Sequence, residues 1–173
     1  MSLLRRIFGH TGGRAALAPL YRAIVAAARD PAWYRDGRVP DTMDGRFDMV
    51  AAVTALVLLR LEAEGEAGRA SSALLTELFV EDMDGILRQI GIGDQMVGKH
   101  VGRMIGALGG RLAALREARA LGDFEAAVRR NLFHDDPPAD ESVALVAGRL
   151  ARLATALDSQ PSAALLRGEV PGP

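Results

Sequence analysis

Residues 39–64 read VPDTMDGRFDMVAAVTALVLLRLEAE, and this stretch decides the fold class. Its centre, MVAAVTALVLL (49–59), is apolar apart from Thr54 and is followed at once by Arg60. A bilayer-spanning helix needs about 18 to 20 predominantly apolar residues, so this run is too short to cross a membrane. The pattern instead predicts a helix from about Asp44 to Glu64 that is buried inside the protein.

Polar residues immediately before this run predict the N-terminal cap of the helix. Asp41, Thr42 and Asp44 can each accept hydrogen bonds from the exposed N–H groups of the first turn, where carboxylates also suit the helix dipole. Arg46 has two expected partners: a nearby aspartate, or the acidic segment EDMD at 81–84.

The same stretch does not fit a calcium-binding loop, and no catalytic motif accompanies it. With Gly45 at position 6 of an EF-hand loop, Pro40 stands at the first ligand position and Ala51 at the last. A nucleophile elbow, a Walker loop and a dinucleotide-binding motif are all absent from the sequence. We therefore predict no catalytic residue, no metal site and no cofactor. The three histidines are far apart in sequence and lack metal-ligand spacing: His10, His100 and His134.

Length and composition suit one domain or a compact pair of subdomains. The chain has 173 residues, 49% of them hydrophobic, which is enough to enclose a core. It contains no cysteine, and its net charge of −1 gives no general attraction to nucleic acid. Its 20 arginines with a single lysine, beside abundant alanine and glycine, are typical of a GC-rich bacterial coding bias. The charge is uneven, since residues 1–38 carry a net +5 and residues 39–84 a net −7.

Helical periodicity recurs along the rest of the chain, and no stretch alternates as a strand would. We expect an all-α fold, a compact bundle of about six helices without a sheet. Residues 1–13 are expected to be a flexible N-terminus, 14–158 a single domain, and 159–173 a flexible tail. Residues 30–40 are expected to be irregular. The other predicted helices cover 14–29, Ser71 or Ser72 to Gly91, Asp94 to Ala120, Asp123 to the loop at 134–140, and Ser142 to Leu157.

A row of glycines marks the helix that starts at Asp94. Gly98, Gly102, Gly106 and Gly110 recur every four residues. Each interior glycine costs a helix about 0.8–1 kcal/mol relative to alanine, so the row needs a reason. Two explanations are open: tight packing against another helix of the same chain, or a groove that accepts a helix of a partner.

Several ordered segments resemble the ubiquinol–cytochrome c chaperone family, whose members are assembly factors for the cytochrome bc1 complex. The resemblance extends over roughly residues 19–133. Its segments are LYRAIVAAARDPAWYRD (20–36), VPDTMDGRFDM (39–49), LVLLRL (56–61), ELFVEDMDGILRQIGIGD (77–94), GKHVGRM (98–104) and GGR (109–111).

The resemblance implies an all-helical chaperone without enzymatic activity that binds newly made cytochrome b or another bc1 subunit. It also implies a possible second contact with a small helical partner or with the ribosome. We expect a cytoplasmic location, with peripheral contact at the inner face of the bacterial inner membrane as an open alternative. Whether the chain forms homo-oligomers is also left open.

Charged residues within the matched segments are the candidate partner contacts. They are Asp41, Asp44, Arg46, Asp82, Asp84, Arg88, Lys99, Arg103 and Arg111. The alternative function is a helical domain that binds haem or another small molecule, for which His100 and His134 are the ligands to test.

Overall fold

The computed structural model describes the backbone of residues 3–89, 94–134 and 138–172, and side chains within 13–86, 98–134 and 138–172. No residue in these ranges forms a strand, so the all-α prediction is confirmed. In chain order the helices are α1 (Leu3–Ala28), α2 (Pro31–Arg35), α3 (Met43–Glu62), α4 (Glu66–Gln89), α5 (Asp94–Leu121), α6 (Glu125–Val128), the π-helix η1 (Arg129–Phe133), α7 (Asp140–Ser159) and α8 (Ser162–Leu166).

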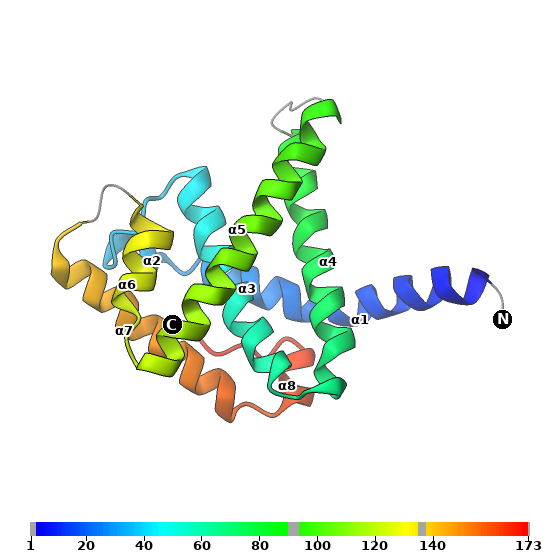
Figure 1. Ribbon diagram of the computed structural model, residues 1–173. Coiled ribbons are helices and arrows are strands. Elements are labelled where there is room, and N and C mark those ends of the chain that lie inside the picture. The colour runs from blue at the N-terminus through cyan, green and yellow to red at the C-terminus, as the bar shows by residue number, and fades with distance from the viewer. Residues whose placement is uncertain (1–2, 90–93, 135–137, 173) are drawn as a thin grey trace.

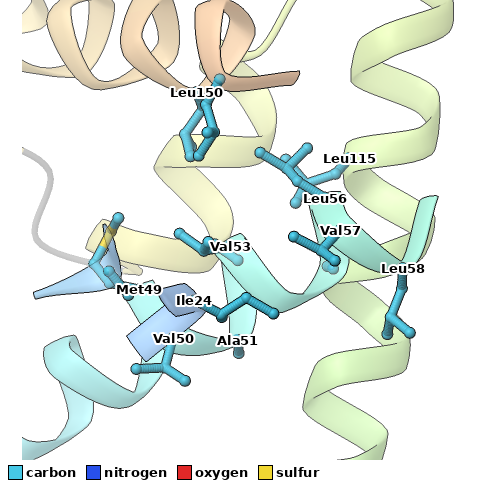
Figure 2. Packing of buried hydrophobic residues seen from close by; sticks show 14 of the residues in the cluster. Ile24, Met49, Val50, Ala51, Val53, Leu56, Val57, Leu58, Leu115 and Leu150 are labelled. Carbon is cyan, nitrogen blue, oxygen red and sulfur yellow. The ribbon is translucent and has the colours of Figure 1, made fainter. Parts of the chain in front are cut away.

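Helix α3 lies at the centre of the fold. Every residue from Asp48 to Leu61 is buried, as predicted for the apolar run. A helix that is apolar on all sides must be enclosed by other elements. Helices α1, α4, α5, α7 and η1 all contact α3, and Figure 1 shows them arranged around it. Figure 2 shows Ile24 of α1, Leu115 of α5 and Leu150 of α7 gathered around side chains of α3.

The first turn of α3 is closed by a side-chain cap and a close backbone contact. Thr42, one of the predicted caps, accepts a hydrogen bond at Oγ1 from the Gly45 N–H at 3.1 Å. A Cβ at position 45 would lie 2.0 Å from the Pro40 carbonyl oxygen, so only glycine fits there. Gly45 is the glycine that was aligned with position 6 of an EF-hand loop. Its role in the structure is to let the backbone of α3 pass close to Pro40.

Residues 30–40, predicted to be irregular, contain the short helix α2. Asp30 caps it by accepting a hydrogen bond from the Ala32 N–H at 2.8 Å, and Pro31 occupies the first helical position. Trp33 is fully buried, and its indole N–H donates to the Ala27 carbonyl at 2.9 Å. The prediction of an irregular stretch was wrong for two reasons. A helix of five residues is too short to show helical periodicity in the sequence, and its position depends on the burial of Trp33.

Helix α4 begins at Glu66, before the predicted caps at Ser71 and Ser72. The Ser72 hydroxyl donates to the Gly68 carbonyl at 3.0 Å, so it bonds within the helix and caps nothing. Helix α1 likewise begins at Leu3, before the predicted start at Arg14, and its first turns extend away from the other helices (Figure 1). The predicted stop at Gly91 lies outside the described residues.

The segment after α7, predicted to be a flexible tail, contains the short helix α8. Leu165 of α8 is fully buried, and α8 packs against α1. Gly168 has a φ of +90°, and a Cβ there would lie 2.7 Å from the Pro19 carbonyl oxygen. Arg60 of α3 ties the end of α7 to this segment by donating to the carbonyls of Leu157 at 3.0 Å and Gln160 at 3.1 Å.

Replacing Leu165 with alanine should lower the free energy of unfolding by about 2–5 kcal/mol, because the substitution leaves a cavity between α8 and α1. Urea denaturation measures the loss. Leu121→Ala is the matched control, since Leu121 is 72% exposed and its truncation should change stability little. Equal stability of the two variants would contradict the packing of α8.

Candidate functional site

Three candidate residues lie together at the start of α3. Asp41, Asp44 and Arg46 are all exposed, and Arg46 Nε donates to Asp41 Oδ1 at 2.6 Å. The guanidinium lowers the pKa of the Asp41 carboxyl below its ordinary value. Of the two partners expected for Arg46, the structure selects the nearby aspartate. This exposed pair leaves both side chains within reach of another molecule.

The acidic segment of α4 is tied to α1. Tyr21 donates its hydroxyl proton to Asp82 Oδ2 at 2.9 Å, and burial together with the Asp82 carboxylate raises the pKa of Tyr21. Asp82 therefore links two helices, although it is only half-buried. Asp84 is also half-buried. The candidate side chain of Arg88 lies outside the described residues.

Arg111 was predicted to contact a partner, and this does not fit its position, because only 6% of the residue is exposed. Its guanidinium pairs with the buried carboxylate of Asp48 and donates to the Asn131 carbonyl at 3.1 Å. It also lies over the Phe47 ring, 5.6 Å from the centroid. Arg111 therefore joins α5 to α3 and η1 inside the fold.

Sequence reasoning missed Asp48, the carboxylate that Arg111 needs. Burial raises the pKa of Asp48, while the charge of Arg111 opposes that shift. His134 is the second partner, with Nε2 2.7 Å from Asp48 Oδ2. The sequence did contain a sign of this pair, because Asp48 stands directly before the apolar run at 49–59. A carboxylate that is buried with such a run requires a partner.

The glycine row of α5 is exposed. Gly98, Gly102, Gly106, Gly109 and Gly110 all face outward, and an added Cβ at any of them would meet no atom of the described residues within 4 Å, apart from the backbone of α5 itself. The explanation by tight packing within the chain was therefore wrong. The buried residues of α5 fall on its other side, where it packs against α3: Leu108, Arg111, Ala114, Leu115 and Ala118.

Two cationic candidates border these glycines. Lys99 and Arg103 are exposed, and Arg103 lies 3.3 Å from Nδ1 of His100. Ile105, 45% exposed, adds an apolar side chain. We define the glycine face as Gly98, Lys99, Gly102, Arg103, Ile105, Gly106, Gly109 and Gly110.

The candidate residues thus occupy separate places. The start of α3 adjoins α4, since the Phe47 and Phe79 ring centroids lie 6.0 Å apart. Lys99 and Arg103 belong to α5, whose first turns project with the end of α4 beyond the other helices (Figure 1). Arg111 is inside.

Both histidines named for the haem alternative have a partner within the chain. His134 is engaged with Asp48, and His100 with Arg103. Across the described residues no three His, Asp or Glu side chains are grouped as metal ligands would be. Among the described helices, none is long and apolar enough to cross a membrane.

Comparison with known proteins identifies a family. The family described as Ubiquinol-cytochrome C chaperone matches residues 35–171. The crystal structure of the Cbp3 homolog from Brucella abortus is similar at a TM-score of 0.80 and 28% identity, with 99% of this chain and 97% of that chain covered. The comparison with curated proteins gives no match.

Arg111→Met should lower the free energy of unfolding by about 3–5 kcal/mol, because it leaves the Asp48 carboxylate buried beside an apolar side chain. Urea denaturation measures this loss. Arg46→Met breaks the exposed pair with Asp41 and should leave the unfolding midpoint close to that of the wild type. A stable Arg111→Met variant would show that the buried pair is dispensable.

Gly106→Ala should raise the free energy of unfolding by about 0.8–1 kcal/mol, because alanine favours the helix and its Cβ meets nothing. Gly45→Ala serves as the opposite control and should destabilise the protein, because the added Cβ collides with the Pro40 carbonyl. Thermal unfolding of both variants checks the contrast. Destabilisation by Gly106→Ala would mean that the glycine face is packed.

Proposed function

The chain belongs to the ubiquinol-cytochrome C chaperone family, and we propose that it acts without enzymatic activity in assembly of the cytochrome bc1 complex, by binding newly made cytochrome b. Family membership and the similarity to the Cbp3 homolog from Brucella abortus support the role in assembly. The exposed glycine face is the observation that supports a client-binding surface on α5.

The glycine face suits a helical client that belongs in a membrane. Interior glycines weaken α5, and nothing in the described part of the chain packs against Gly102 or Gly106. Small residues let two helix backbones approach closely, which is how helices pack where hydrophobic burial offers little driving force. The proposed contact is therefore a client helix lying across the face, close to the backbone of α5.

Charged side chains at two places would orient this client. Lys99 and Arg103 belong to the glycine face, while Asp41, Asp44 and Arg46 are exposed at the start of α3. Rim charges mainly set the encounter rate and the orientation of a partner. Arg88 stays a predicted contact, whereas Asp82 and Arg111 support the scaffold through Tyr21 and Asp48.

Affinity capture of the tagged chain from a lysate that contains membranes should recover cytochrome b, measured by quantitative mass spectrometry. Gly102→Leu with Gly106→Leu should reduce that recovery at least fivefold, because the new side chains fill the face. Lys99→Glu with Arg46→Glu should also reduce it.

Ala144→Leu is the control for the leucine variants, since Ala144 is exposed on α7, far from α5 in sequence. Circular dichroism establishes that each variant is folded. Full recovery with the leucine pair would refute the glycine face as the binding surface. Failure of the wild-type chain to retain any bc1 subunit would refute the proposed client.

A further inference from the structure

A hollow of about 310 Å³ lies where three segments of the chain meet. Arg29 follows α1, Tyr34 and Arg35 belong to α2, and Asp41 and Arg46 flank the start of α3. Pro31 completes the lining. The hollow thus carries three arginines and one aspartate, a net charge of +2, in a chain whose net charge is −1.

Two of these arginines have no anionic partner in the described part of the chain. Arg46 pairs with Asp41, but no carboxylate oxygen there lies within 4.0 Å of the Arg29 or Arg35 guanidinium groups. Arg22 stands two turns before Arg29 on the same side of α1 and is also exposed, which adds positive potential. Asp41 balances only one of the three positive charges, so the remaining like charges repel one another. An incoming anion would relieve this repulsion.

Part of the lining is held in place by hydrogen bonds to the rest of the fold. Tyr34 donates its hydroxyl proton to the Ala28 carbonyl at 2.8 Å, which fixes the ring against the end of α1. Arg149 of α7 donates to the Ala32 carbonyl and pairs with Asp36 at 3.1 Å, which anchors both ends of α2. The three arginines of the lining are exposed, so their side chains can adjust to a ligand while the Tyr34 ring stays fixed.

We propose that this hollow is a binding site for a phosphate group. Guanidinium groups donate paired hydrogen bonds to phosphate oxygens, and one phosphate can accept from several arginines at once. Three arginines around one small hollow suit a single compact anion with several oxygens better than a row of separate carboxylates. The net charge of +2 attracts a phosphate monoester, which carries a charge of about −1.5 to −2, and also the singly charged phosphodiester of a lipid headgroup.

Two sources carry this chemistry: a free phosphate compound and the headgroup of an anionic phospholipid. Titration of the purified chain with inorganic phosphate, followed by amide chemical shifts at constant ionic strength, tests the first. Flotation with phosphatidylglycerol-containing vesicles, against vesicles of phosphatidylcholine alone, tests the second. No client protein is present, so failure of the proposed function cannot cause failure here.

Arg29→Gln with Arg35→Gln should weaken binding at least tenfold in whichever arm the wild type binds. Arg152→Gln is the matched control, an exposed arginine on α7, and should stay within twofold. Saturable binding of phosphate without vesicle binding supports a free compound, and vesicle binding that requires phosphatidylglycerol supports a headgroup. Absence of binding in both arms, equal loss in the Arg152→Gln control, or preference for a glutamate-rich peptide over phosphate would overturn the proposal.

Discussion

Burial of α3 on all sides is the constraint on which the rest of the structure depends. A helix without a polar face cannot lie on a surface, because each buried apolar side chain contributes only when neighbours exclude water around it. Five elements meet that requirement, and their arrangement around one axis determines the bundle. The polar atoms that enter this core need partners there. Arg60 donates a hydrogen bond to the Leu157 carbonyl at the end of α7, and Asp48 forms an ion pair with Arg111.

The pair between Asp48 and Arg111 also determines which side of α5 faces outward. Residues of a helix advance by about 100° each, so a side chain that points inward places those on the opposite side in solvent. With Arg111 directed at Asp48, Gly102 and Gly106 are directed away from the core. A buried ion pair is weak evidence for added stability, but it is well suited to selecting one rotation of a helix. This internal contact therefore determines which residues of α5 are exposed to solvent.

Local patterns in the sequence were sufficient to predict the helical class, the central helix and the threonine cap at Thr42. These features depend on residues within one or two turns of each other. The packing of Leu165, the burial of Arg111 and the role of Asp48 depend on segments far away along the chain, and a single sequence does not show such pairings. The glycine row of α5 shows both what local spacing predicts and what it cannot predict. Its spacing identified an unusual face, but only the position of the core determined whether that face was inside or outside.

The makeup of the glycine face bears on how a client would be released. Backbone and hydrogen atoms dominate such a surface, with Ile105 as its one large apolar side chain. A client bound there, as proposed, would rely on fit between two helices, so its departure would expose little apolar area on the chaperone itself. After the client has left, the glycine face would present no large apolar patch through which two copies of the chaperone could aggregate. A surface with so little apolar area would favour the reversible engagement that the proposed role requires.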